Sequence, residues 1–547
     1  MLSPLIALLA CTQPDEADMI LTNGIIRTID KNKPEAEAVA VRNGRILAVG
    51  TAADMRQYTG KATKVIDLHG KLLLPGFIDD HTHFMSGGFQ LQSVDLRHSG
   101  SETEFARIVK ERAERYPERW ITGGDWDHDN WPSGRLPSKE LIDQYTPHTP
   151  VFVSRYDGHM GLANSYVLKL AGITRDTPDP PGGNIVKDPA TGDPTGILKD
   201  GAMSAVYALI PDPTETEMLE AAKLALAEAR KFGVTSIQDV SSAADVEIYH
   251  KLRDAGELTA RFHCRQPIGM TEDLIRRGVK VPTGDEWVRL GSLKGFADGS
   301  LGSTTALFFE PFTSDPTTRG LATDVVQDGT LRRLALAADK AGLQLSIHAI
   351  GDSANSLILD LFEEIIRTNP SWARRFRIEH AQHIRPKDFA RFARLEVIAS
   401  VQPYHAIDDG RWAEGRIGHE RCKTTYAFKT FIDNGVKLCF GSDWTVAPLN
   451  PLLGIYAAVT RRTTDGKNPE GWFPEQKITV QEAVEAYTIN NAYAAFEENE
   501  KGSIEKGKLA DFVVLSDNIF TIDPVNIEST KVVMTVVGGK IVFETGQ

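Results

Sequence analysis

Eight short apolar runs constrain the fold of this chain more than any other feature. The first spans residues 77–83, and the others span residues 233–240, 260–268, 288–299, 343–352, 375–384, 395–405 and 436–444. Helical patterns follow these runs, and the intervening segments 214–232 and 329–342 are amphipathic at helical spacing. Strand–helix units in this number predict an α/β fold, a (β/α)8 TIM-like barrel. The alternative, an open doubly wound sheet, is expected to carry a Gly-rich phosphate turn, and this sequence has none.

The two ends of the chain have a different texture, in which turn dipeptides separate short strands. Three such dipeptides each stand between two apolar runs: Asn23-Gly24, Asn43-Gly44 and Gly538-Gly539. They indicate β-hairpins. Because this pattern occurs only at the ends, we expect residues 18–76 and 500–547 to form one small β-sandwich. The barrel would then occupy residues 77–499.

A long segment interrupts the barrel pattern after its first strand. About 150 residues separate His83 from the second apolar run, too many for a single helix. We therefore predict a large insertion over about residues 85–230, with a hairpin in the Gly- and Pro-rich stretch 180–198. An insertion at this point in a barrel enzyme would lie over the catalytic mouth and act as a lid.

The first residues resemble a lipoprotein signal. The apolar run that ends in Leu8-Leu9-Ala10-Cys11 is similar to a bacterial lipobox, whose cysteine is acylated after cleavage. We predict that residues 1–17 are a signal and tether, that Cys11 carries a lipid anchor, and that the protein lies in the bacterial periplasm or cell envelope. Against this, no basic residue precedes Arg27, and a cytoplasmic location is the alternative.

Charge and cysteine content exclude several classes of protein. With 61 basic and 74 acidic residues, the net charge of -13 argues against nucleic acid as a partner, because that role needs a basic surface. The four cysteines are far apart and include no C-x-x-C pair. They therefore indicate neither a disulfide framework nor a cysteine-rich zinc site.

Polar residues with metal-binding side chains recur where the predicted barrel strands end. His81 and His83 are two residues apart on the first strand, so their side chains point the same way. The complete set is His81, His83, Lys294, His348, His380 and Asp443. Each alone has an ordinary structural explanation, but barrel enzymes place their chemistry at strand ends. Imidazole and carboxylate groups are the ligands expected for Zn²⁺ or another divalent ion in an open catalytic site.

Seven motifs in this order resemble the amidohydrolase superfamily. They are LPGFIDDHTHF, VSRYDGHMGLANS, LKGFADGSLGS, IHAIGDSAN, RIEHAQHI, FGSDWTVAPLNPL and GSIEKGKLADFVVL. The resemblance runs from Asp18 to Gln547, and it is closest to the amidohydrolase-3 branch, which includes the YtcJ-like proteins and the N-substituted formamide deformylases. These motifs are specific for fold and metal chemistry and much less so for substrate.

The resemblance implies a binuclear site, with two Zn²⁺ ions expected and Mn, Fe or Co as alternatives. His81, His83 and Asp443 would hold the more buried metal, and His348 and His380 the more exposed one. The family's lysine at the position of Lys294 is N6-carboxylated and bridges the metals. The alternative for Lys294 is an ion pair with Asp298, which would leave a site for one metal. His383 competes with His380, but the family pattern favours His380.

We therefore predict an enzyme, a metal-dependent amidohydrolase that cleaves a C–N bond other than a peptide bond in an amide, N-formyl compound or cyclic amide. Asp443 would be the proton shuttle, and His159, in the family's DGH segment, would contact the oxyanion or leaving group. Aromatic residues in segments predicted to line the mouth favour a small-molecule substrate with an apolar or aromatic substituent: Trp126, Trp131, Phe308, Phe309, Tyr404 and Trp444. The alternatives are an ester, a lactone or a deaminated ring as substrate, or a non-catalytic sensor or regulatory protein.

Overall fold

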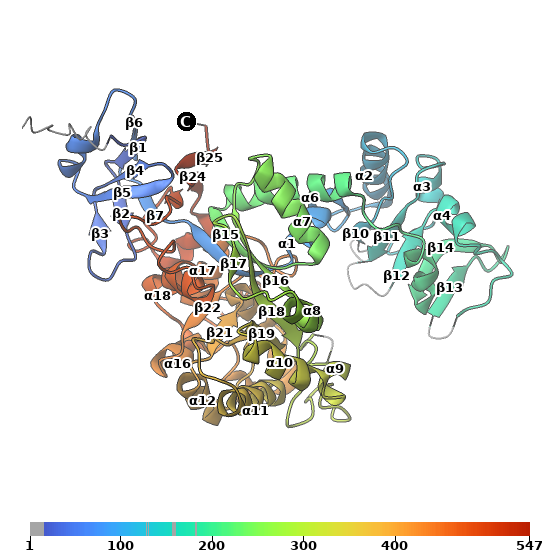
Figure 1. Ribbon diagram of the computed structural model, residues 1–547. Coiled ribbons are helices and arrows are strands. Elements are labelled where there is room, and N and C mark those ends of the chain that lie inside the picture. The colour runs from blue at the N-terminus through green and yellow to red at the C-terminus, as the bar shows by residue number, and fades with distance from the viewer. Residues whose placement is uncertain are drawn as a thin grey trace, which may run out of the picture. The chain divides into compact units, whose positions relative to one another are not determined.

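The computed structural model describes residues 16–126, 128, 131–155, 160–180, 183–302 and 304–546. The chain divides into two compact units (Figure 1). One contains the residues up to Phe84 and from Leu226 onward, and the other contains Met85–Ala225. Cys11, the predicted lipid anchor, lies outside the described residues. Among those that are described, no helix has the length and apolar character needed to cross a membrane.

The larger unit contains the predicted barrel. Its parallel strands neighbour one another in chain order: β8 (Phe77–Thr82), β15 (Val234–Val240), β16 (Arg261–Pro267), β18 (Val288–Phe296), β19 (Gln344–Ala349), β20 (Arg377–His380), β21 (Ile398–Val401) and β22 (Leu438–Phe440). A short strand, β17 (Thr283–Gly284), pairs antiparallel with β18. The first and last strands meet where the Asp443 N–H donates to the His81 carbonyl at 2.7 Å. The prediction of a (β/α)8 barrel is confirmed.

Gly441 allows this closure, because it lies directly against the first strand. A Cβ at this position would stand 2.4 Å from the backbone nitrogen of His81. Nearby, the Asp79 carboxylate accepts hydrogen bonds from the backbone N–H groups of His81 and Ser442, both at 3.0 Å. The junction of β8 and β22 therefore depends on the absence of a side chain at residue 441.

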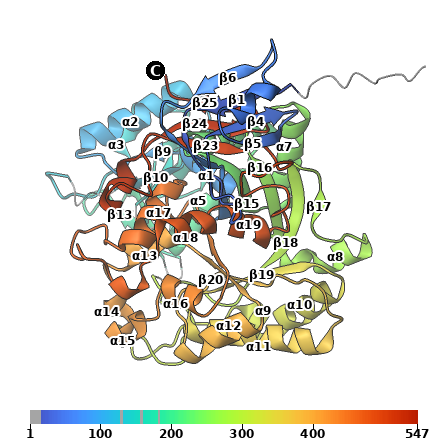
Figure 2. The ribbon, with the colours of Figure 1, turned by 90° about the vertical axis from the view of Figure 1, so that its left-hand side faces the viewer.

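Helices lie between the strands and cover the barrel (Figures 1 and 2). Those that follow the strands are α7 (Ala243–Asp254), α8 (Thr271–Arg276), α9 (Asp324–Gln327), α10 (Thr330–Lys340), α11 (Asp352–Thr368), α12 (Phe389–Arg394), α13 (Pro403–Asp409), α14 (Ala413–Ile417), α15 (His419–Cys422), α16 (Phe428–Asp433), α17 (Pro451–Thr460), α18 (Val480–Ala486) and α19 (Ile489–Ala494). The amphipathic pattern of α10 has its expected result, since Leu331, Leu334, Ala335 and Ala338 are buried.

Strands from both ends of the chain build the predicted sandwich. One sheet has the order β5 (Arg45–Gly50), β4 (Ala38–Arg42), β1 (Met19–Thr22) and β6 (Lys64–Asp67). The other has the order β25 (Lys540–Glu544), β24 (Val532–Val537), β23 (Phe512–Leu515), β7 (Leu72–Pro75), β2 (Ile25–Arg27) and β3 (Glu35–Ala36). A shared apolar core, which includes Leu21, Leu73 and Phe512, joins the two sheets.

Two of the three expected hairpins are confirmed, and one is wrong. β4 and β5 pair across Asn43-Gly44, and β24 and β25 pair across Gly538-Gly539. In contrast, Asn23-Gly24 joins strands of different sheets. β1 pairs in parallel with β6 in one sheet, and β2 pairs in parallel with β7 in the other. The chain therefore passes from the first sheet to the second at two places, between β1 and β2 and between β6 and β7. The Asn23 side chain donates to Asp67 at 2.7 Å and fixes this crossing instead of a hairpin turn.

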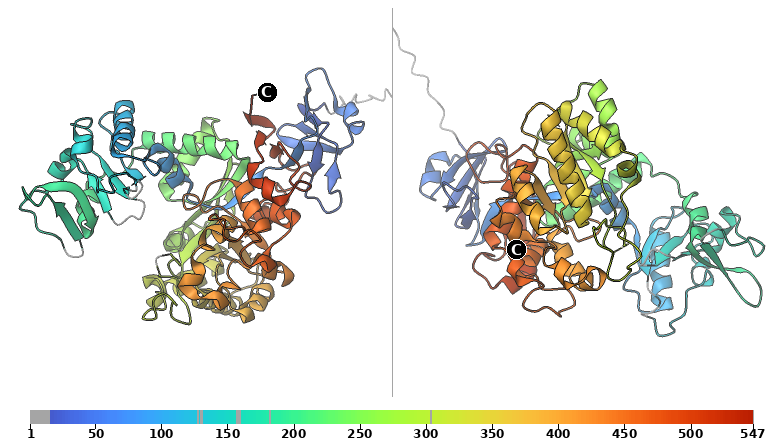
Figure 3. Two further views of the ribbon diagram at one scale, coloured as in Figure 1. Left: turned by 180° about the vertical axis from the view of Figure 1, so that it is seen from behind. Right: turned by 90° about the horizontal axis from the view of Figure 1, so that it is seen from below.

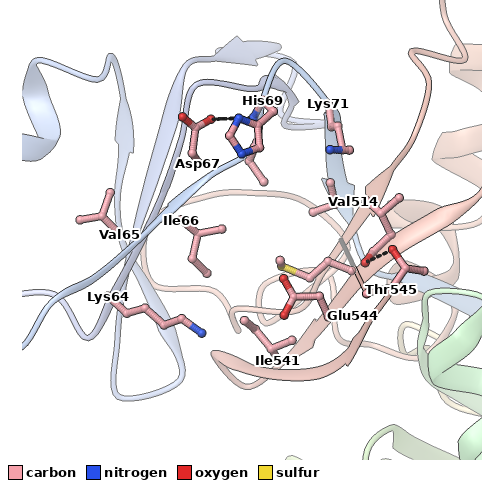
Figure 4. Close-up of a pocket in the computed structure, with 14 residues that line it drawn as sticks. Lys64, Val65, Ile66, Asp67, His69, Lys71, Val514, Ile541, Glu544 and Thr545 are labelled. Carbon is pink, nitrogen blue, oxygen red and sulfur yellow. Dashed lines mark hydrogen bonds and ion pairs between the residues drawn. The ribbon is translucent and has the colours of Figure 1, made fainter.

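A cleft of about 540 Å³ lies in the sandwich, beside the edge strand β6 (Figure 4). The apolar side chains of Ile66, Val514 and Ile541 contribute to its wall, together with Lys64 and Glu544. The cleft is thus formed by both ends of the chain and contains none of the predicted metal ligands.

The insertion after the first barrel strand has its own sheet (Figure 3). The strand order is β13 (Gly183–Lys187), β14 (Pro194–Asp200), β12 (Met160–Ala163), β11 (Phe152–Arg155), β10 (Gly123–Trp126) and β9 (Val94–Asp95). The antiparallel pair β13 and β14 is the expected Gly- and Pro-rich hairpin. Helices α2 (Glu102–Arg115), α3 (Glu140–Asp143), α4 (Ser165–Leu170) and α5 (Ser204–Tyr207) complete this unit, and α1 (Phe84–Gln92) and α6 (Glu215–Lys231) connect it to the barrel.

A buried ion pair connects the barrel to the C-terminal part of the sandwich. Arg261 of β16 donates to the carboxylate of Asp511 at 2.7 and 3.0 Å, and both side chains are buried. We expect Asp511→Ala to lower the free energy of unfolding by about 3–5 kcal/mol, because the Arg261 guanidinium would lose its buried partner. Denaturant unfolding measures this change, and Asp517→Ala, at an exposed position, is the control. A loss similar to the control would contradict the prediction.

Candidate metal centre

All six predicted ligands line one cavity at the carboxyl end of the barrel strands. Its volume is about 490 Å³. The six are His81 in β8, His83 directly after β8, Lys294 in β18, His348 in β19, His380 at the end of β20 and Asp443 shortly after β22. Five different strands therefore bring these side chains together, as a catalytic site at a barrel mouth requires.

His81, His83 and Asp443 form the tightest group. One nitrogen from each histidine and one carboxylate oxygen lie within 4.8 Å of one another. The Asp443 Oδ1 atom lies 3.7 Å from His81 Nε2 and 3.4 Å from His83 Nε2. Burial and the charges of Lys294 and Arg265 hold the pKa of His81 well below its usual range. The imidazole is therefore neutral and keeps a lone pair for a metal.

Glu379 orients His81 through a hydrogen bond. Its Oε2 atom lies 2.5 Å from His81 Nδ1, so that Nε2 faces Asp443.

Two arginines pair with the carboxylate of Glu379. Arg265 lies 2.8 Å from it and Arg377 lies 3.0 Å from it, and all three side chains are fully buried. The Ser400 hydroxyl also donates to it at 2.8 Å. This carboxylate was not among the predicted site residues, although a glutamate in a buried strand beside His380 is a sequence signal that would have found it.

We expect Glu379→Gln to weaken metal binding by about 10–100-fold, because the orienting hydrogen-bond acceptor of His81 would lose its charge. Competition with a chelator of known affinity measures this change. The same substitution at an exposed glutamate, Glu470→Gln, is expected to leave the affinity unchanged. Equal affinities in the Glu379 variant and the wild type would exclude this orienting role.

Lys294 is buried and lies against a predicted ligand rather than in an ion pair with Asp298. Its Nζ atom is 3.2 Å from His81 Nε2, and burial lowers its pKa to about 7. The carboxylate of Asp298 accepts instead from backbone N–H groups of Leu307, Ile350 and Gly351 at 2.8–3.0 Å. Asp298 therefore anchors the loops that follow β18 and β19.

His348 and His380 lie together in the same cavity. Their ring centroids are 4.5 Å apart, and those of His380 and His81 are 5.0 Å apart. His380 Nδ1 lies 2.7 Å from the Gln402 side-chain oxygen, which leaves Nε2 for a ligand. The competing residue, His383, bonds through Nδ1 to the Thr425 hydroxyl at 2.7 Å and does not line the cavity.

The other predicted site residues lie elsewhere. His159 is outside the described residues. Trp126 is fully buried in the core of the insertion and donates to the Val153 carbonyl at 2.8 Å, so packing accounts for this residue without a substrate contact. Trp444 is 5% exposed and packs edge-to-face on Phe84, and its carbonyl accepts from the His83 N–H at 2.7 Å. Trp444 therefore positions the segment that carries His83.

The chemistry of the donor set fits a divalent metal. Two neutral imidazoles are held by acceptors on their far nitrogens, and a carboxylate stands beside them. Nitrogen and oxygen donors with oriented imidazoles are typical of catalytic zinc sites. His81, His83 and Asp443 fit one ion, and His348 and His380 offer donors for a second.

Comparisons with known proteins agree with this chemistry. The model of the "Amidohydrolase family" matches residues 64–543. Protein LONG AFTER FAR-RED 3 of Arabidopsis thaliana is 40% identical, over 96% of this chain and 92% of that protein. Putative amidohydrolase YtcJ of Bacillus subtilis is 33% identical, over 95% and 98%, and the N-substituted formamide deformylase of Arthrobacter pascens is 28% identical, over 96% and 98%. A crystal structure of an uncharacterized metal-dependent hydrolase from Pyrococcus furiosus aligns with a TM-score of 0.76 and 28% identity, over 93% of this chain and 99% of that one.

Proposed function

Since the chain belongs to the amidohydrolase family and is related to metal-dependent hydrolases, we propose that it hydrolyses the C–N bond of an amide, N-formyl compound or cyclic amide. One observation carries this proposal: side chains from five barrel strands, suited to a divalent metal, meet in one cavity. The formamide deformylase among its relatives supports a C–N bond as the target.

His81, His83 and Asp443 would hold one ion, and His348 and His380 a second. Zn²⁺ suits this donor set, with Mn, Fe or Co as alternatives. A bound divalent ion of this kind lowers the pKa of water towards neutrality and polarises a carbonyl oxygen. Lys294 would complete the centre as a carbamate: its neutral amine attacks the carbon of CO₂, an N–C bond forms as one C=O π bond opens to give the carboxylate, and the nitrogen releases a proton to water. The lowered pKa of Lys294 supports this step, because it supplies the neutral amine near pH 7.

Asp443 would move the proton. Its carboxylate accepts a proton from the attacking water as the water oxygen bonds to the carbonyl carbon. It then delivers that proton to the nitrogen as the C–N bond breaks, which regenerates the carboxylate. The hydrogen bond to Glu379 holds the imidazole of His81 in place while the Asp443 carboxylate takes up and releases the proton.

The cavity wall favours a substrate with an apolar or aromatic substituent. Five side chains form its apolar part: Phe296, Leu301, Ile350, Trp412 and Val446. Phe296 and Val446 are 42% and 71% exposed, so both offer apolar surface to a ligand. Apolar contacts of this kind bind a substituent, while the polar groups of the centre orient the reacting bond.

Metal analysis and a substrate screen test the proposed function. The protein is loaded with Zn²⁺, Mn²⁺ or Co²⁺ and assayed with N-formyl, N-acyl and cyclic amides, each paired with the ester of the same skeleton. We expect bound metal, and turnover of amides with an aromatic substituent. Failure to retain a metal ion would overturn the proposal. Turnover of the esters alone would show that the bond cleaved is a C–O bond and not a C–N bond.

A further inference from the structure

His405 lines the cavity but belongs to none of the predicted ligands. It lies on α13 (Pro403–Asp409), three residues after Gln402, which holds His380. The strand before it, β21, lies between β20, which ends at His380, and β22, which precedes Asp443. β21 itself supplies no predicted ligand, so the segment after it reaches the cavity between these two.

The Nε2 atom of His405 is buried and has no hydrogen-bond partner among the described residues. An unpaired polar atom in such a place is unfavourable, because the loss of its bonds to water is not compensated. The predicted ligands His81 and His380, in contrast, each have a nitrogen held by a side-chain oxygen. A partner for His405 must therefore come from the cavity that it lines.

Helix α13, which carries His405, is anchored through its last residue. The carboxylate of Asp409, at the end of the same helix, accepts from the Tyr426 hydroxyl at 2.6 Å and from the Gln382 amide at 3.1 Å. Burial raises the pKa of Asp409, and the nearby His405 opposes this rise. His405 also helps, after the predicted histidine ligands, to hold the pKa of Asp443 well below its usual range against the effect of burial. The imidazole thus lies within electrostatic reach of both carboxylates.

We propose that His405 is a catalytic residue whose imidazole donates a hydrogen bond to the carbonyl oxygen of the bound amide, an inference that rests on the proposed amide hydrolysis. The oxygen gains negative charge as water adds to the carbonyl carbon, so a donor at that point stabilises the transition state more than the substrate. Because the bonds of Asp409 to Tyr426 and Gln382 fix the helix that carries His405, the backbone need not reorganise to supply this donor.

The test compares His405→Leu, His405→Gln and the surface control His419→Gln with the wild type. His419 is exposed on α15 and bonds to Glu414, away from the cavity. Three quantities are measured: turnover of the best amide, affinity for its phosphonamidate analogue, and metal content. We expect His405→Leu to lower kcat by about 10²–10³-fold with KM little changed. Affinity for the tetrahedral analogue should fall by a similar factor, because it imitates the transition state.

His405→Gln keeps an N–H donor and is expected to retain part of both quantities. Unchanged kcat and analogue affinity in His405→Leu would overturn the inference, as would a variant that loses its metal. If His405→Leu does not fold, His405→Ala, which also lacks a donor, decides: a kcat and an analogue affinity equal to those of the wild type contradict the role. Absence of amide turnover in the metal-loaded wild type would refute the proposed function instead, so the two failures are distinguishable.

Discussion

Asp443→Asn is expected to lower kcat on an amide substrate by about 10²–10⁴-fold while the protein keeps much of its metal. The asparagine oxygen still lies beside His81 and His83, at the place of an atom now 3.7 and 3.4 Å from their Nε2 atoms. What the amide cannot do is accept a proton from water and pass it to the leaving nitrogen. Turnover and metal content, measured on the same sample, separate these two roles of Asp443.

Asp433→Asn is the matched control, because Asp433 is an exposed residue that pairs with Lys429 on α16. It should have wild-type kcat. Full turnover in Asp443→Asn would exclude the proton shuttle. A loss of activity in strict proportion to the loss of metal would show that Asp443 acts only as a metal ligand.

Lys294→Ala is expected to lower kcat/KM by at least about 100-fold, because the centre would lose the anion that the proposed carbamate would provide. Added acetate or propionate should restore part of the activity, since a short carboxylate fits the space that the lysine side chain leaves. The wild type incubated with ¹³C-labelled bicarbonate should show a carbamate signal by NMR that Lys294→Ala lacks.

Lys387→Ala, a change at an exposed lysine, controls for loss of charge and should have no effect. A wild type with no carbamate signal, together with a variant that carboxylates do not rescue, would contradict the bridging role. Lys294 would then act through its direct contact with His81, where its Nζ atom lies 3.2 Å from Nε2.

The barrel was predictable because its strands are periodic along the chain. Each run of buried residues is local, and its order in sequence is its order in space. The six predicted metal ligands share this property, since each lies at or near the end of one run. Their convergence then follows from the parallel arrangement of the strands.

The partners that a residue acquires from distant parts of the chain were not predictable, even where its position was a signal. Glu379 acquires its role from His81 and from Arg265, which lie on other strands. The prediction of a hairpin at Asn23-Gly24 is wrong for the same reason, because pairing with the parallel strands β6 and β7 determines the path of the chain there. Local turn chemistry describes neither pairing.

The closure of the barrel at Gly441 has a consequence for biosynthesis. His81 and Asp443 come together only where the first and last strands meet, so a ribosome must make the chain beyond residue 443 before this pair of predicted ligands can form. The first barrel strand, β8, can meet the last strand, β22, only after β22 has been made. A contact of such long sequence separation slows folding. A metal ion that binds both His81 and Asp443 links the first and last strands, and therefore stabilises only the closed barrel. Amide hydrogens at this junction, such as that of Asp443, should therefore exchange more slowly in the metal-loaded protein than in the metal-free one.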